Sequence, residues 1–344
     1  MSLRNYGVAK GRPLEHHRET DDDTPHYQIH LDGGGTSFRI PVNVKSSIEP
    51  SQLVYFETAT FIHPLTDTLF ALAPGCHRLP SRPGGAAIDY IRSNPFDFEK
   101  VIALPHDLPG MDNDLSDLLE SRVNRAIADP EAMIYAFGER WGPEGQRDQV
   151  FGFAPGNGVH DIHMNQGNAS RFVGDDGVWQ DGAFLIHHPA EHRWSALFLA
   201  FQSQALHTDD ETGHALPGSR RFEDVVRGGG IPGEFNDGIV RIVGALVNPL
   251  GHDPGLESVT LLNVSPEPID LVGWQIANRN DDRFTIGDVI IGAGATARIA
   301  LPADIAPLSN QGGEISLLDR QEARVHGVAY TGAQVSRQGW TIAF

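Results

Sequence analysis

The stretch HYQIHLDGGGTSFRIPVNV, residues 26–44, decides the fold of the first part of the chain. Hydrophobic and polar residues alternate in HYQIHL (26–31) and again in TSFRIPVNV (36–44), which is the period of a half-buried strand. The glycines of DGGG (32–35) supply the positive φ angles that a chain reversal needs. We therefore predict a β-hairpin, and Pro41 predicts an exposed edge or a bulge in its second strand.

Outward from this hairpin, the sequence predicts a mostly β, α+β domain. Asp114 can cap a helix in which hydrophobic residues recur at helical spacing from Leu115 to Ile127, and Asp129-Pro130 ends it. Further strands are expected where hydrophobic runs lie between glycine, proline and asparagine: LVYFET (53–58), MIYAFGERW (133–141), QVFGFA (149–154), GVHDIHM (158–164), GAFLIHH (182–188) and WSALFLAFQS (194–203).

The segment RGGGIPGEFNDG (227–238) has the composition of a linker. Beyond it, hydrophobic segments are short and alternating, turn residues recur about every ten residues, and no helical pattern occurs. These features predict a small antiparallel β-sandwich. We therefore expect two domains, residues 1–230 and 238–344.

Composition excludes several classes of function. The chain has 344 residues, with 45 Asp and Glu against 26 Lys and Arg, a net charge of −19. This charge disfavours an extended nucleic-acid-binding surface and a basic membrane-docking face. One cysteine, Cys76, excludes an internal disulfide and any cysteine-cluster metal site. No apolar run is long enough to cross a membrane and the start lacks a secretory signal, so we expect a cytoplasmic protein, with export without a cleavable signal left open.

The segment GVHDIHMNQGN (158–168) carries the strongest chemical signal, in a region rich in histidine. If it is extended, Asp161, His163 and Asn165 project from one face, and Asp161 can orient the His163 ring or share a cation with it. Asn165 or Asn168 can polarise a developing oxyanion. We predict His160, His163 and Asn165 as catalytic residues, with Asp161 and Asn168 in binding. The alternative is structural polar packing.

Three residues outside this segment are secondary candidates. Glu139 follows an apolar strand and can act as an acid or base, while Arg140 can hold an anion. The alternative for both is a solvated ion pair. His187 and His188 end another strand, where alternation sends them to opposite faces, and we favour His188 on the expectation that it faces away from Ile186.

The first part of the chain resembles the YukJ-like family of bacterial proteins, whose function is unknown. The similarity covers about residues 1–220, and no reaction follows from it. Its motifs are NYGVAKGRP (5–13), HYQI (26–29), VNVKS (42–46), YAFGERWGPEG (135–145), GNGVHDIHMNQGN (156–168) and DGVWQDGAFLIHHP (176–189).

The second part resembles the bacterial lamin-tail domain. Its pattern is carried by GALVNPLGHDPGLESVTLLNVSPEPIDLVGWQIANRN (244–280) and PLSNQGGEISLLD (307–319). The resemblance implies an immunoglobulin-like sandwich with Trp274 in its core, and Glu257 is expected to hydrogen-bond loop backbone. Such domains are often appended to hydrolases, and we expect this one to contact a protein or glycan partner.

Two functions follow as hypotheses. The first is a metal-assisted hydrolase of phosphodiesters, for which histidines and a carboxylate suit zinc, nickel or manganese. The alternative is a non-enzymatic two-domain binding or scaffold protein. The two differ in geometry, because catalysis requires the candidate imidazoles to converge in an open cleft. A third alternative is a structural domain that metal stabilises.

Overall fold

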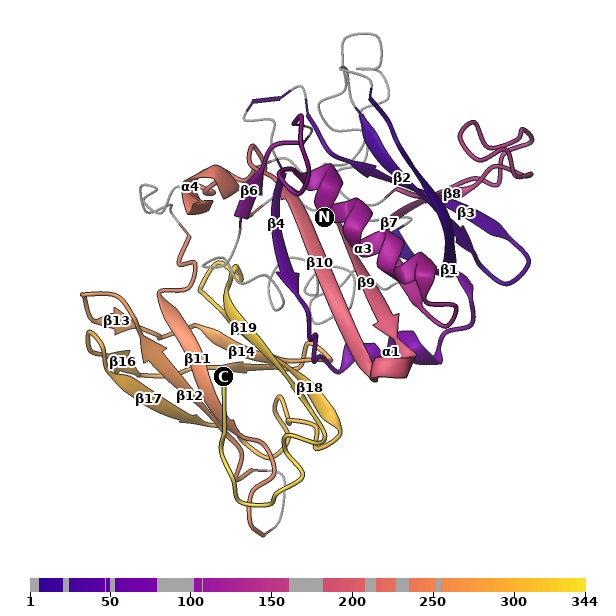
Figure 1. Ribbon diagram of the computed structural model, residues 1–344. Helices are drawn as coiled ribbons and strands as arrows, with labels where there is room; N and C mark the ends of the chain where they lie inside the picture. The colour runs from indigo at the N-terminus through magenta and orange to yellow at the C-terminus, as the bar shows by residue number, and fades with distance from the viewer. Residues whose placement is uncertain are drawn as a thin grey trace. The chain divides into compact units, whose positions relative to one another are not determined.

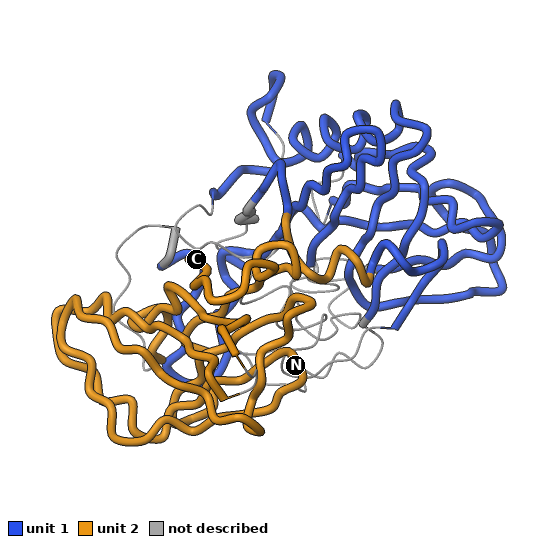
Figure 2. Tube along the Cα trace, turned by 90° about the horizontal axis from the view of Figure 1, so that it is seen from below, with its two compact units in different colours: residues 1–61, 69–81, 96–231 blue, residues 62–68, 82–95, 232–344 orange. Residues whose placement is uncertain are grey.

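The chain forms two compact units, each rich in β-strands (Figures 1 and 2). The first is drawn chiefly from residues before Pro232, and the second from Pro232 onward together with Ile62–Thr68. The computed structural model describes residues 6–20, 25–46, 48–49, 53–78, 102–106, 108–160, 182–207, 215–226, 235–251 and 255–344.

One large sheet dominates the first unit. Its strands are β1 (Tyr6–Arg18), β2 (His26–Asp32), β3 (Ser37–Asn43), β4 (Leu53–Thr58), β5 (Gly75–Arg78), β6 (Ile102–Leu104), β7 (Met133–Trp141), β8 (Gly158–His160), β9 (Gly182–His188) and β10 (Arg193–Phe201). The helices that the structure describes before Pro232 are α1 (Leu65–Ala71), which the division between the units crosses, α3 (Leu115–Ala128), the 3-10 turn Pro189–Glu191 and α4 (Phe222–Val226).

The predicted hairpin is confirmed as β2 and β3, which pair antiparallel along their whole length. At the turn, one carboxylate oxygen of Asp32 accepts the N–H groups of Gly34 at 2.9 Å and Gly35 at 3.3 Å, and both glycines have positive φ. Among the described residues, β8 pairs with β3 at Arg39 alone, so Pro41 lies where β3 has a strand partner on one side.

Five of these strands close into a barrel. The second half of β1 pairs with β2 and its first half pairs with β7, while β8 joins β3 in parallel and β7 in antiparallel fashion. The ring therefore runs β1-β2-β3-β8-β7 and back to β1. A register shift between Pro13 and Glu15 marks the bulge that lets one strand serve both partners. This is the connectivity of an OB-type barrel, with α3 immediately before the fourth strand of the ring, β7.

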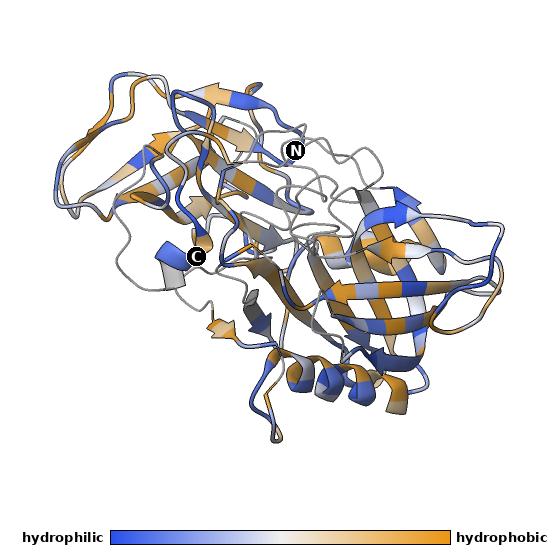
Figure 3. Ribbon diagram, turned by 90° about the horizontal axis from the view of Figure 1, so that it is seen from above, coloured by the Kyte–Doolittle hydropathy of each residue, from blue (hydrophilic) through white to orange (hydrophobic). Residues whose placement is uncertain are grey.

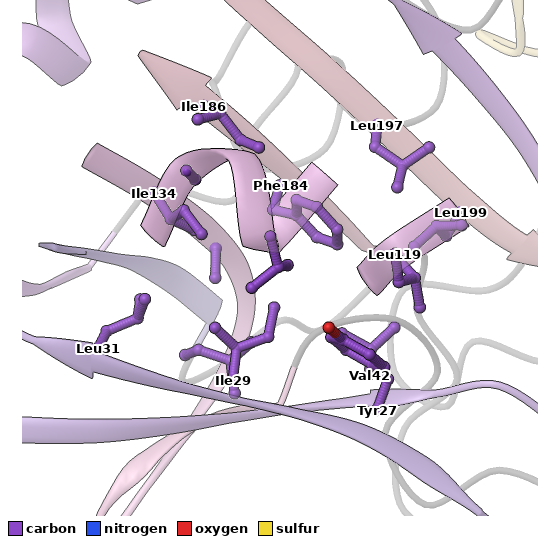
Figure 4. Packing of buried hydrophobic residues seen from close by; sticks show 14 of the residues in the cluster. Tyr27, Ile29, Leu31, Val42, Leu119, Ile134, Phe184, Ile186, Leu197 and Leu199 are labelled. Carbon is purple, nitrogen blue, oxygen red and sulfur yellow. The ribbon is translucent and has the colours of Figure 1, made fainter. Parts of the chain in front are cut away.

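The core of the first unit lies inside the barrel and beneath α3. Asp114 caps α3 by accepting the N–H of Asp117 at 2.9 Å, and the helix ends at Asp129, as the sequence predicts. Leu119 and Val123 are fully buried on its inner face. They meet hydrophobic side chains from the barrel interior and from β9 and β10, which continue the sheet past β7 (Figure 4).

Most of the strands expected in this unit are confirmed, including β4, β7, β9 and β10, but the strand at 149–154 is wrong. These residues form a turn, because the carboxylate of Asp148 accepts the N–H groups of Val150 at 3.0 Å and Phe151 at 2.7 Å. The carbonyl of Asp148 also accepts the N–H of Gly152, which has positive φ. Side-chain to backbone bonds of this kind compete with a sheet ladder.

The second unit is an antiparallel sandwich, as predicted. Two four-stranded sheets, β17-β12-β11-β20 and β15-β14-β18-β19, contribute to one hydrophobic core, and β13 pairs with β16. Hydrophobic and hydrophilic residues alternate along the strands (Figure 3). The strands are β11 (Val240–Leu246), β12 (Ser258–Asn263), β13 (Ile269–Asp270), β14 (Gln275–Asn278), β15 (Arg283–Thr285), β16 (Ile290–Ile291), β17 (Thr296–Ala300), β18 (Gly312–Leu318), β19 (Arg324–Thr331) and β20 (Ile342–Ala343).

Two residue-level predictions in the sandwich are confirmed. Trp274 is buried in its core. Glu257 is buried as well, and both of its carboxylate oxygens accept the backbone N–H of Leu308, at 3.1 and 3.0 Å. The carboxylate therefore holds the loop that precedes β18.

Candidate functional site

Glu139, Arg140 and His160 lie in the short stretch where β7 pairs with β8. Glu139 lies directly opposite His160 of β8, and on its other side it lies opposite Tyr6 of β1. Arg140 lies opposite Val159. The side chain of Glu139 is half-buried and that of Arg140 is exposed. The register therefore brings Glu139 beside His160, although the two are about 20 residues apart in the chain.

The rest of the predicted catalytic segment begins at this point. Asp161, His163, Asn165 and Asn168 lie outside the described residues, which end at His160 and resume at Gly182. Their roles stay predictions.

His188 lies at the other end of β7. Its neighbour His187 is in register with Met133, six residues along β7 from Glu139, a separation of about 20 Å. His188 is buried, and its Nδ1 lies 3.8 Å from a carboxylate oxygen of Asp129. Alternation places His188 on the same face as buried Ile186, so the expected orientation is wrong. His188 thus stays apart from Glu139, and burial lowers its imidazole pKa.

His187 lies on the opposite face of the sheet, among aromatic rings. Its imidazole stacks on Trp194 at 4.6 Å between centroids and meets the edge of Phe70 at 5.4 Å. Burial, together with nearby His188 and Lys10, lowers the pKa of His187. The amine of Lys10 donates to the carbonyls of Phe70 and Leu72 at 2.9 and 2.7 Å, at the end of α1. These bonds give Lys10 a structural role as a helix cap.

A connected set of polar side chains lies on the outside of the barrel. Gln28 of β2 is buried, and its amide nitrogen donates to a carboxylate oxygen of Glu19 at 2.6 Å. Its amide oxygen accepts from Arg39 of β3 at 3.1 Å, and Arg39 donates to Asp148 at 2.6 Å. We call the surface formed by Glu15, Glu19, Gln28, His30, Arg39 and Asp148 the barrel face.

The barrel face joins two loops of the barrel through these side chains. Glu19 lies just beyond β1, where its other carboxylate oxygen accepts the N–H of His26 at 2.9 Å. Although burial alone would raise the pKa of Glu19, bonds from His26 and Gln28 lower it below its ordinary value. Asp148 lies in the loop between β7 and β8, and the guanidinium of Arg39 also lies 4.9 Å from the ring centroid of Trp141 in β7. Because the network is hydrogen-bonded to a loop at each end, through Glu19 and through Asp148, its side chains are held in fixed positions.

A carboxylate and an imidazole form a second part of the barrel face. Nδ1 of His30 lies 2.9 Å from a carboxylate oxygen of Glu15, its direct cross-strand partner. The His30 ring lies nearly parallel to the rings of Phe151 and Phe153, with centroids 5.0 and 5.1 Å away. Sequence reasoning missed this face. The available signal was the alternation of HYQIHL, which sends Gln28 and His30 to the side opposite the core.

Two searches of the described ranges concern metal ions and membrane spans. No three His, Cys, Asp or Glu side chains there gather in a way that suits a metal ion. None of the helices in the same part of the chain has the length and apolarity that a membrane span requires.

Comparison with known proteins establishes the family of the first unit. The model of the family described as "Uncharacterized conserved protein (DUF2278)" matches residues 1–213. This chain belongs to that family. The Bacillus subtilis (strain 168) protein "Uncharacterized protein YukJ" is 42% identical over 213 residues, which are 61% of this chain and 93% of that protein. No solved structure matches the chain. The YukJ-like resemblance of the sequence is thereby confirmed for this region.

Proposed function

We propose that this protein is a binding protein and that the first unit holds its ligand on the barrel face. The observation that carries the proposal is the row of hydrogen-bonded side chains Asp148, Arg39, Gln28 and Glu19 across neighbouring strands. Buried polar side chains that bond to one another, and through Asp148 and Glu19 to loop backbone as well, make a rigid, chemically specific surface.

The barrel topology supports the same proposal by analogy. OB-type barrels bind oligonucleotides and oligosaccharides on the face of their second and third strands, between two adjoining loops. Here the second and third strands are β2 and β3, which carry Gln28, His30 and Arg39. The second unit, which resembles a lamin-tail domain, then supplies a second contact, to a protein or glycan partner. This is the two-domain binding protein that the sequence suggests as the alternative.

The test is binding by the full chain. Purified protein is applied to an array of oligosaccharides and single-stranded oligonucleotides, and the affinity of each hit is measured by calorimetry. Arg39→Gln, which removes the link between Gln28 and Asp148, is expected to weaken binding about tenfold or more. Arg125→Gln is the matched control, since Arg125 pairs with Glu191 on the exposed surface. Equal loss in both variants, or loss in neither, would contradict the proposal.

A second candidate is metal-assisted phosphodiester cleavage, with zinc, nickel or manganese as the ion. It is favoured by the register of Glu139 opposite His160, at the start of the segment that holds His163 and Asn165. Histidine and carboxylate ligands suit these borderline ions, which would activate a water molecule. Generic phosphodiesters and nucleic acids are incubated with the protein and each metal. Equal activity in the wild type and in His163→Ala would remove this candidate.

A further inference from the structure

We infer that His30, oriented by Glu15, accepts a hydrogen bond from a hydroxyl group of a neutral oligosaccharide. The inference rests on the proposed function, because it names the ligand class of the barrel face. Two observations carry it: an imidazole nitrogen that has no hydrogen-bond partner among the described residues, and a pair of phenylalanine rings stacked on the same imidazole.

The first observation concerns the imidazole. Nδ1 of His30 lies 2.9 Å from the carboxylate of Glu15, which fixes the ring and favours a proton on Nδ1. Nε2 then presents a lone pair. Nε2 is buried and has no hydrogen-bond partner in the structure described here, and the whole residue is 8% exposed. Buried acceptors are almost always satisfied, so one left open in an oriented ring is suited to a donor from a ligand.

The second observation concerns the rings that stack on this imidazole. Phe151 and Phe153 lie nearly parallel to the His30 ring and are only half-buried. They belong to the turn at 149–154, which has no sheet ladder and is fastened through Asp148. The turn that carries these rings can therefore adjust to a ligand beside the imidazole without unpairing a strand. Apolar rings around a few fixed polar groups are the usual composition of a small-molecule site.

Charge decides between a neutral and an anionic ligand. Glu15, Glu19 and Asp148 place three carboxylates on the barrel face. Its guanidinium, Arg39, is already paired with Asp148 at 2.6 Å. A phosphodiester chain would meet like charge here, whereas an uncharged hydroxyl can donate to Nε2 and to carboxylate oxygens alike.

The experiment uses the full chain and three probes: uncharged hexose oligosaccharides, acidic oligosaccharides and a ten-nucleotide thymidine strand. Binding is measured by calorimetry, and the His30 ring nitrogens are followed by NMR. We expect an uncharged oligosaccharide to bind and to shift the Nε2 resonance. His30→Phe, which keeps an aromatic ring but removes the acceptor, should weaken this binding about tenfold. Glu15→Gln should weaken it about threefold, and Glu131→Gln, at an exposed position, should leave it unchanged.

The outcomes separate the inference from the proposed function. If the thymidine strand or an acidic sugar binds in an Arg39-dependent way and uncharged sugars do not, the inference is wrong and the proposed function stands. Uncharged sugars that bind wild type and His30→Phe equally also overturn the inference. If no probe binds in an Arg39-dependent way, both fail. Should His30→Phe not fold, the test depends on Glu15→Gln and on the Nε2 resonance: unchanged affinity in Glu15→Gln together with an unshifted Nε2 resonance would overturn the inference.

Discussion

The two units bury polar side chains in different ways. In the second unit, buried polar groups bond to loop backbone: Glu257 accepts the N–H of Leu308, and the amide of Asn263 donates to the carbonyls of Glu267, Ile291 and Gly292. On the barrel face of the first unit, Glu19 and Asp148 also accept backbone N–H groups, but there Gln28 and Arg39 join the two carboxylates through side-chain bonds. Bonds to backbone fix loops, whereas bonds between side chains hold those side chains in fixed positions relative to one another.

The largest effect should come from breaking the network of the barrel face. Arg39→Gln leaves the fully buried carboxylate of Asp148 without its ion-pair partner, so we expect the free energy of unfolding to fall by about 3 kcal/mol. Urea unfolding measures the change, and hydrogen exchange by mass spectrometry locates it. Faster exchange should be confined to peptides of β2, β3 and the loop at 142–157. If Arg39→Gln instead accelerates hydrogen exchange in the sandwich, the network does not stabilise the first unit alone, and the prediction is wrong.

The matching change in the second unit should be somewhat smaller. Glu257→Ala leaves the buried N–H of Leu308 without its acceptor, and we expect a loss of about 2 kcal/mol. Because this bond fixes a loop, exchange should accelerate near residue 308. Ligand binding to the barrel face should not change. A loss of binding in this variant would contradict the division between loop-fixing and surface-building polar groups.

Acid should weaken the second unit through His326. Burial, with Arg324 and Arg241 nearby, lowers its pKa to about 4, and its Nδ1 accepts the N–H of Ile242 at 3.1 Å. The unfolded chain binds this proton near pH 6.5, so this contribution to stability is full above that pH and is lost progressively as the pH falls toward 4. Urea midpoints measured between pH 7 and pH 4 check this. His326→Asn, which keeps an acceptor but does not titrate, should flatten the slope, and an unchanged slope would exclude His326 as its source.

The smallest effect is expected at the surface. Arg125 and Glu191 form an exposed ion pair at 2.8 Å, and Arg125→Gln should leave the urea midpoint unchanged within error. The same variant is the control for Arg39→Gln. A clear loss here would mean that removal of any arginine from the first unit is destabilising, and the comparison of the two kinds of polar burial would lose its meaning.

Particular residues show how far sequence reasoning reaches in this protein. Alternation and turn glycines were sufficient for the β2–β3 hairpin, and a capping aspartate for α3, because these signals are local. The strand expected at 149–154 failed since one carboxylate, Asp148, captures the backbone N–H groups around it. The orientation of His188 was predicted wrongly, because residues two apart on a strand share a face and His188 therefore lies on the same side as the buried Ile186.

By itself, the sequence determined the elements: the hairpin, the capped helix, most strands, the sandwich and the acidic character that disfavours polyanions. Only the tertiary structure decided that β1 closes on β7, that β8 lies parallel to β3, and that Glu15, Gln28 and Asp148 share one face. The physical reason is range. Periodicity and turn chemistry act over a few residues, whereas barrel closure depends on pairings between segments more than 100 residues apart, which no local pattern encodes.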